Sequence, residues 1–106
     1  MTVRLSERIK QHLTKEYGLA PEDVDLVYAA SVESLKQNIQ DLETFLRASH
    51  ESAAQTAHGM KGNLLNMGLP ELAQRAKEIE EDAKKGNLTC LEPKFLEIKE
   101  QLAEVL

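Results

Sequence analysis

Apolar residues recur along this chain at intervals of three and four residues, which is the spacing of one face of an α-helix. The pattern is interrupted at four places and so divides into five segments, whose apolar residues span positions 5–17, 24–46, 53–67, 72–83 and 91–105. Leucine, alanine, glutamate, lysine and glutamine dominate the composition, and these residue types favour helix over strand. We therefore predict five helices.

Residue types that begin and end helices stand at the interruptions. Gly18 follows the first segment, in the position that a helix C-terminus prefers, and Pro21 opens the second, where its missing N–H does no harm. Ser49 is a candidate N-cap for the third segment, which Gly68 ends, and Pro70 begins the fourth. The sequence thus predicts the limits of the first four helices.

The last interruption is Gly86 with the following Asn87. After it, residues 89–92 (TCLE) have the pattern of a capping box, and Pro93 is tolerated in the first turn of a helix. All the connections are short, so consecutive helices are expected to lie antiparallel. We predict an all-α fold, an antiparallel up-down four-helix bundle with a short additional N-terminal helix, as a single domain over residues 1–106.

The apolar residues of each segment form one stripe per helix, and we expect these stripes to make up the core. The first stripe has spacings of four, and the others alternate spacings of four and three, which suits helices that pack at shallow angles, as in bundles. The stripes are Leu5, Ile9, Leu13 and Tyr17; Val24, Tyr28, Val32, Leu35, Ile39, Leu42 and Leu46; Ala53, Ala57, Met60, Leu64 and Met67; Leu72, Ala76, Ile79 and Ala83; and Leu91, Phe95, Ile98, Leu102 and Val105.

Charge and composition narrow the class of protein. The chain of 106 residues carries a net charge of −5 and no basic cluster, which argues against nucleic acid as a partner. Its one cysteine, Cys90, rules out an internal disulfide and fits a reducing cytoplasm. No apolar run resembles a signal peptide or is long enough to span a bilayer. We therefore expect a soluble, cytoplasmic helical domain with no membrane partner.

The run from Ala57 to Gly62 is the most informative part of the chain. Two glycines, Gly59 and Gly62, follow His58 inside a predicted helix, and each costs about 1 kcal/mol relative to alanine. A glycine one turn beyond the histidine removes a side chain that would crowd the imidazole, and Lys61 lies on the same side of the helix. An imidazole, a cation and a cleared surface suit a site that handles an anion and is approached by a partner.

A helical wheel places this histidine on the outside of the bundle. At about 100° per residue, His58 lies about 140° from the centre of the core stripe, and Gly62 lies nearly opposite the core. Few large charged side chains share that face, and Leu65 adds an apolar spot. Such a patch is typical of a docking surface, and we predict that it comprises Gln55, Gly59, Gly62, Leu65 and Asn66.

Counting residues from the turn at Gly68 predicts which part of the next helix lies beside His58. Positions about ten to twelve after the turn return to its level, which brings Glu78, Ile79 and Glu80 there. Ile79 belongs to the core stripe, so we take Glu80, ahead of Glu78, as the candidate orienter of the imidazole. An acceptor on one ring nitrogen fixes the tautomer and leaves the other nitrogen free as a nucleophile.

Other polar residues stand in no such motif. We expect His12 and His50 at the surface, and the acidic run over residues 78–82 to form a solvated face, followed by lysines that suit a helix end. His58 and Glu80 could instead be two ligands of a metal ion. No third ligand stands at a fitting spacing, so we predict no metal site.

These residues together resemble a known family. The run TAHGMKG at residues 56–62, followed by Gly68, Leu72-Ala73 and Ile79-Glu80, resembles the histidine-containing phosphotransfer (HPt) domain of multistep two-component relays. The close match covers about residues 53–80, and the helical pattern of the whole chain is consistent with the bundle of that family. Asn63 and the two leucines after it replace small residues that several relatives carry, which affects docking preference more than chemistry.

The resemblance implies a role for each residue of the motif. His58 would be the phosphorylated residue, Lys61 would steady the phosphoryl oxygens, and Gly62 would let the partner approach. Glu80 is similar in position to a residue that contacts the other ring nitrogen in relatives. The phosphoryl group would arrive from, or return to, an aspartate on a response-regulator receiver domain, and a hybrid histidine kinase is a further partner.

The chain lacks the parts that a kinase needs. It has no Walker loop or glycine-rich phosphate cradle, and no clustered carboxylates for Mg²⁺. We therefore expect a phosphoryl carrier rather than an enzyme. It needs no cofactor of its own, and Mg²⁺ belongs to the receiver partner only.

Two other functions stay open. A non-phosphorylated helical adaptor would use the same patch to bind a receiver domain without chemistry. A phosphoacceptor domain of a chemotaxis-type histidine kinase would instead be phosphorylated directly from ATP by a kinase domain. The chain starts at Met1 and carries no further domain, which favours a free-standing carrier. Because the apolar stripes can be satisfied within one bundle, we expect a monomer.

Overall fold

The computed structural model of the chain describes residues 4–87 and 91–106. Within these residues it contains helices and no strand, so the prediction of an all-α chain is confirmed. The five helices of this part of the chain are α1 (Leu5–Tyr17), α2 (Pro21–Phe45), α3 (His50–Asn66), α4 (Pro70–Lys84) and α5 (Leu91–Leu102).

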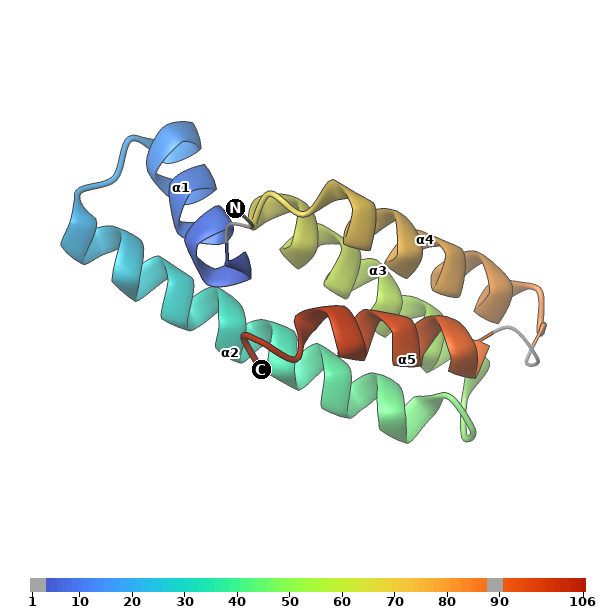
Figure 1. Cartoon of the computed structure of the whole chain (residues 1–106). Helices are drawn as coiled ribbons and strands as arrows, with labels where there is room; N and C mark the ends of the chain where they lie inside the picture. Colours follow the sequence, from blue (N-terminus) through green and yellow to red (C-terminus); the bar gives the residue numbers. More distant parts are fainter. Residues whose placement is uncertain (1–3, 88–90) are drawn as a thin grey trace.

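Helices α2 to α5 lie along a common long axis, and the chain reverses direction at each connection between them (Figure 1). Helix α1 packs on the N-terminal half of α2. Contacts are most extensive between α3 and α4, while α3 also packs on α2 and α4 also packs on α5. Helix α3 therefore has a neighbour on either side, and the rest of its circumference is exposed.

The helix ends follow the residue types at the interruptions. Gly18 has a left-handed backbone with a φ of 61°, and its N–H donates to the carbonyl of Thr14 at 2.9 Å, as a C-terminal glycine does. Pro21 stands in the first turn of α2. The hydroxyl of Ser49 accepts from the N–H of Ser52 at 3.2 Å and so caps α3. These predicted limits are confirmed.

The turn between α3 and α4 is made by Gly68 and covered by α1. Gly68 has a φ of 78°, and a Cβ added there would lie 2.3 Å from Cγ of His12. The prediction that His12 lies at the surface is wrong, because the missing side chain of Gly68 lets the imidazole pack half-buried against the turn. A salt bridge of 2.9 Å between Arg8 and Glu71 also joins α1 to the first turn of α4.

The predicted apolar stripes form the core of the molecule, and their partly buried members lie at its margin. Ala54 and Ala73, beside the stripes of α3 and α4, are buried as well and broaden the contact between these helices. Tyr17 departs from the prediction, since it lies at the very end of α1 and is 51% exposed. The partly buried stripe residues are Leu5, Tyr28, Leu46 and Val105.

The start of the last helix lies partly outside the described residues. The predicted capping box includes Thr89 and Cys90, which are not described. Leu91 is buried at the beginning of α5, and Pro93 lies in its first turn, as expected. Helix α5 ends before Val105, so it is shorter than its predicted apolar stripe.

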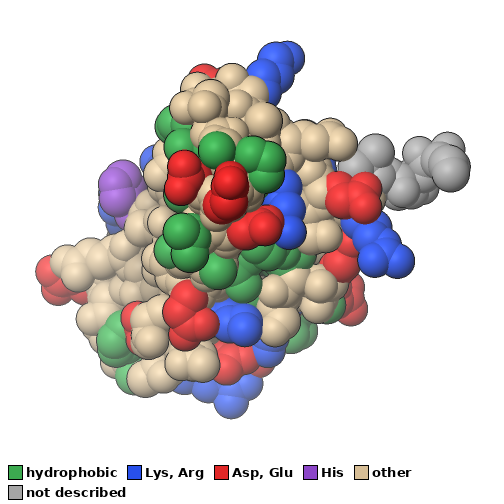
Figure 2. Space-filling view, turned by 90° about the vertical axis from the view of Figure 1, so that its left-hand side faces the viewer, with side chains coloured by type: hydrophobic (Ala, Val, Ile, Leu, Met, Phe, Trp, Pro, Cys, Tyr) green, Lys and Arg blue, Asp and Glu red, His purple; other side chains and the backbone are tan. Residues whose placement is uncertain are grey.

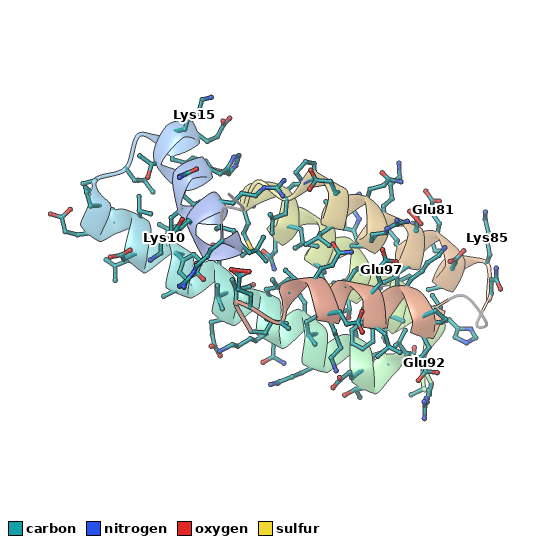
Figure 3. The ribbon with its side chains drawn as sticks, in the orientation of Figure 1. Lys10, Lys15, Glu81, Lys85, Glu92 and Glu97 are labelled. Atoms are coloured by element: carbon teal, nitrogen blue, oxygen red, sulfur yellow. The ribbon has the colours of Figure 1, made fainter. Side chains whose placement is uncertain are left out.

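The prediction of a solvated acidic face on α4 is wrong for most of its residues. Asp82 is half-buried and lies 2.7 Å from the ammonium group of Lys94 on α5, and Glu78 lies 3.8 Å from the same group. Glu80 is only 8% exposed. Glu81, in contrast, projects away from the bundle (Figure 3). The reason is that α4 packs between α3 and α5, so only one side of it faces solvent.

Candidate functional site

His58 lies on the side of α3 that faces away from the core. Ala57, Met60 and Leu64 on the same helix are fully buried, whereas the His58 side chain is 65% exposed. The helix is therefore held by its buried side while the imidazole stays accessible. The predicted outward direction of His58 is confirmed.

Across from His58, α4 carries the one buried polar side chain in the described part of the chain, Glu80. Nδ1 of His58 lies 3.2 Å from Oε2 and 3.3 Å from Oε1 of this carboxylate. An ionised carboxylate only accepts hydrogen bonds, so Nδ1 carries a proton, and in the neutral ring Nε2 carries the lone pair. No hydrogen bond among the described residues involves Nε2, which leaves this nitrogen available for reaction.

Two lysines share this carboxylate with the imidazole. Nζ of Lys84, one turn further along α4, lies 3.1 Å from Oε2 of Glu80, and Nζ of Lys61 lies 3.9 Å from Oε1. Burial raises the pKa of Glu80, but the hydrogen bonds from Lys84 and His58 outweigh it, so the pKa of Glu80 lies below its ordinary value of 4.5. The carboxylate is therefore ionised at neutral pH and holds a negative charge beside the imidazole.

Glu78, the other candidate neighbour of the imidazole, makes contacts elsewhere. Its carboxylate lies 3.3 Å from Arg75 on the same helix and 3.8 Å from Lys94 on α5. Counting residues from the turn therefore selects the right neighbour, since Glu80 makes the contact with His58. Lys84 was not predicted as a member of this cluster. Its spacing of four residues from Glu80 is the signal that would have found it.

A groove of about 880 Å³ opens beside His58, between the first half of α3 and the end of α4. Its walls include His50 and Gln55 from α3, and Lys84 and Lys85 from the other side. Figure 3 shows Lys85 at the C-terminal end of α4. Because α3 begins where α4 ends, residues far apart in the sequence meet here. Of the predicted docking residues only Gln55 lines this groove, and His50, Lys84 and Lys85 were not predicted for the site.

The glycines after His58 leave the outward face of α3 open. A Cβ added at Gly62 would meet nothing within 4 Å, and one added at Gly59 would meet only Nδ2 of Asn38, at 3.9 Å. Packing inside the protein therefore requires neither glycine. Leu65 is 50% exposed and Asn66 is exposed as well, so the predicted docking face is accessible along the turns that follow His58.

Neither a metal cluster nor a membrane-spanning helix occurs among the described residues. They contain no group of three or more histidine, cysteine, aspartate or glutamate side chains placed to hold a metal ion. None of the described helices is both long and apolar enough to cross a membrane.

Figure 2 views the molecule from the end near the α1–α2 connection, and there acidic and basic side chains are interspersed. That face therefore carries no field of a single sign.

A comparison with protein families covers most of the chain. The family model described as Hpt domain matches residues 27–106. The matched range includes most of α2 and the whole of α3, α4 and α5, and with them His58, Lys61 and Glu80, whereas α1 lies outside it. No curated protein and no solved structure matches the chain.

Proposed function

Because this chain belongs to the Hpt domain family, which acts in two-component phosphotransfer, we propose that it is a histidine phosphotransfer protein. His58 accepts a phosphoryl group from an aspartate of one response-regulator receiver domain and passes it to an aspartate of another. One observation carries this proposal. Nδ1 of His58 lies 3.2 Å from the buried carboxylate of Glu80, and Nε2 is left accessible on an exposed side chain.

The proposed transfer is a nucleophilic displacement at phosphorus. The lone pair of Nε2 attacks the phosphorus of the aspartyl phosphate, the bond from phosphorus to the carboxylate oxygen breaks, and the aspartate leaves as a carboxylate. An N–P bond forms at Nε2 of His58, and the ring, still protonated at Nδ1, becomes positively charged. Ionised Glu80, 3.2 Å from Nδ1, stabilises this charge and retains the proton. The reverse steps return the phosphoryl group to an aspartate.

Lys61 supplies positive charge for the phosphoryl oxygens in this proposal. It lies three residues after His58, on the same side of α3, and its Nζ is 3.9 Å from Glu80, beyond the length of a normal hydrogen bond. Its side chain is 26% exposed. The ammonium group is therefore able to turn toward an oxyanion at Nε2 without breaking a strong contact, and we assign it to stabilisation of the phosphoryl group.

The partner docks on the outward face of α3. Gly59 and Gly62 leave room for its approach, and Leu65, Asn66 and Gln55 offer contacts to it. The receiver domain supplies Mg²⁺, so the chain is a carrier rather than an enzyme and needs no cofactor. A hybrid histidine kinase is a second partner. Helices α2 to α5 serve as an antiparallel four-helix bundle, extended by α1, in a cytoplasmic monomer.

Incubation with a phosphorylated receiver domain and Mg²⁺ tests this function. We expect the intact mass of the wild-type chain to increase by one phosphoryl group, and acid to remove that group, because the N–P bond of phosphohistidine is acid-labile. His58→Gln should fold normally, since the side chain is exposed, and gain no phosphoryl group. His50→Gln, which changes the other exposed histidine of the groove, is the matched control and should behave as wild type.

The same assay separates the alternatives. A helical adaptor would bind receiver domains and gain no mass from any of them. A phosphoacceptor domain of a chemotaxis-type kinase would gain the phosphoryl group from ATP with a kinase domain, and none from a phosphorylated receiver. A phosphoryl adduct on His58→Gln would overturn the assignment of the acceptor residue.

A further inference from the structure

Two asparagines at the junction of α2 and α3 lie beside the outward face of α3. Nδ2 of Asn63 donates to Oδ1 of Asn38 at 2.6 Å and to Oγ of Ser34 at 3.0 Å. A Cβ added at Gly59 would lie 3.9 Å from Nδ2 of Asn38. The surface next to Gly59 is therefore the amide of Asn38, which belongs to a different helix.

The amide of Asn38 has hydrogen-bonding capacity that the protein does not use. Its Oδ1 accepts from Asn63, while no hydrogen bond within the described ranges involves its Nδ2. Turning both amides over would exchange donor and acceptor in the pair and would still leave one polar group of Asn38 unpaired. Because Gly59 has no side chain, nothing from α3 covers this group.

Uncharged residues continue from this amide along both helices. On α2, the positions that share its face toward the start of the helix are Val27, Ser31, Ser34 and Asn38. On α3, the outward positions that follow His58 are Gly59, Gly62, Leu65 and Asn66. These eight positions carry no charged side chain, and Asp41, one turn after Asn38 on α2, bounds them. We call these eight residues the α2–α3 band.

We infer that the α2–α3 band, with the Asn38–Asn63 pair at its centre, determines which receiver domain docks. The surface of that domain that covers the band is uncharged and offers a hydrogen-bond partner to Asn38. This inference rests on the proposed function, because it takes the partner to be the domain that exchanges the phosphoryl group with His58. The α2–α3 band adjoins His58 on the same surface, which supports a receiver domain as the partner that covers it. A domain that reaches Nε2 of His58 over Gly59 covers Asn38 as well.

The chemistry of the band sets the chemistry of its partner. An uncharged partner surface covers the band without leaving any charge unpaired, and the free amide group of Asn38 then gains the hydrogen bond that it lacks. A partner with a charged residue at this place would bury that charge against neutral groups, which disfavours the complex. The band therefore selects among receiver domains by rejecting some of them.

Asn38→Asp tests the inference with the least change in shape. The aspartate still accepts the hydrogen bond from Asn63, but it has no donor and it adds a negative charge to the band. Gln40→Asp is the matched control, since it adds the same charge to an exposed position of α2 that points away from the band. Ser34→Asp, one turn before Asn38, is a second probe of the band. Circular dichroism and thermal unfolding establish that each variant folds.

The dissociation constant is then measured by titration calorimetry, for each variant, with a receiver domain that binds the wild type. We expect Kd to rise about tenfold or more for Asn38→Asp and Ser34→Asp, and by less than about twofold for Gln40→Asp. A wild-type Kd for Asn38→Asp and Ser34→Asp would overturn the inference. Equal weakening by the control would overturn it too, because the effect would then be one of net charge.

Phosphoramidate separates docking from chemistry. This small donor transfers its phosphoryl group to an imidazole with loss of ammonia and needs no docking surface. We expect Asn38→Asp to react with it at the wild-type rate while transfer from the receiver domain is slowed. Slower reaction with both donors would overturn the inference, since Asn38 would then act on His58 itself.

If the wild type binds the receiver domain but takes no phosphoryl group from it, the proposed function fails, and the Kd comparison still decides the role of the band.

Discussion

Glu80 is the residue on which the charges near His58 converge. It contacts Nδ1 of the imidazole and the ammonium group of Lys84, and it lies within 3.9 Å of Lys61. Burial alone would favour its neutral form, but the hydrogen bonds from Lys84 and His58 more than compensate, so the pKa of Glu80 is lowered. A glutamine would keep an acceptor for the Nδ1 proton and would leave the two lysines without a counter-charge.

Glu80→Gln is therefore expected to destabilise the fold in a pH-dependent way. The pKa of Glu80 is below 4.5 in the folded chain and near 4.5 in the unfolded chain, so its contribution is complete above that value and is lost as the pH falls through the folded-state pKa. At about pH 5 we expect the free energy of unfolding to be lower by about 1–2 kcal/mol in the variant, and the difference to shrink toward about pH 3. Urea unfolding at several pH values measures it.

The exposed neighbour Glu81 provides the control for this prediction. Glu81→Gln removes the same charge one residue further along α4 and should leave the free energy of unfolding nearly unchanged. A loss in Glu80→Gln that stays constant between about pH 5 and about pH 3 would contradict the expectation, because the charge of the carboxylate would then not be its cause.

Lys61→Ala is expected to slow transfer and leave His58 open to modification. The ammonium group makes no close hydrogen bond in the resting chain, so its removal should cost little stability. Loss of one cation at a phosphoryl group should reduce the rate of transfer by about ten- to a hundredfold. Rapid-quench kinetics with a phosphorylated receiver domain measure the rate, and Lys77→Ala, at an exposed position of α4, is the control. Unchanged kinetics would remove Lys61 from the mechanism.

Among the helices, the connection between α3 and α4 decides how the site is assembled. Gly68 sets where α3 ends, and the length of α4 after it brings Glu80 level with His58. Helix α1 holds this connection in place through the imidazole of His12. A change at the turn therefore acts on the packing of α1 and on the alignment of the two helices that carry the site.

Gly68→Ala should lower the free energy of unfolding by about 2–4 kcal/mol. About 1 kcal/mol of this comes from a side chain at a φ of 78°, and the rest from the overlap of its Cβ with the imidazole of His12. Gly18→Ala introduces the same kind of backbone strain, at a φ of 61°, where a Cβ meets nothing within 4 Å, and should cost about 1 kcal/mol. Thermal unfolding compares the two. Equal losses would mean that contact with His12 contributes nothing.

Over the whole molecule, local features are predictable from the sequence. Gly18, Ser49 and Gly68 mark helix ends because each supplies a conformation or a hydrogen bond that the end of a helix needs. The outward direction of His58 follows from the periodicity of α3, and its contact with Glu80 follows from the lengths of the two helices.

Features that depend on packing are not predictable in this way. The acidic run around Glu80 has the composition of a solvated face, and this residue is buried only because α4 packs between α3 and α5. The groove depends on the start of α3 meeting the end of α4. The pairing of Asn38 with Asn63 joins two helices across 25 positions of sequence, and neither residue carries a local signal of it.

The circumference of α3 is shared between two tasks. Ala53, Ala57, Met60 and Leu64 face the interior, and the outer side at Gly59 and Gly62 packs against little. Substitutions on the outer side therefore leave the interior unchanged, so descendants of such a chain are free to diverge there while the fold persists. After a gene duplication, a few substitutions on this one helix would suffice to give the two copies different receiver partners. Two signalling pathways would then become separate without any change of fold.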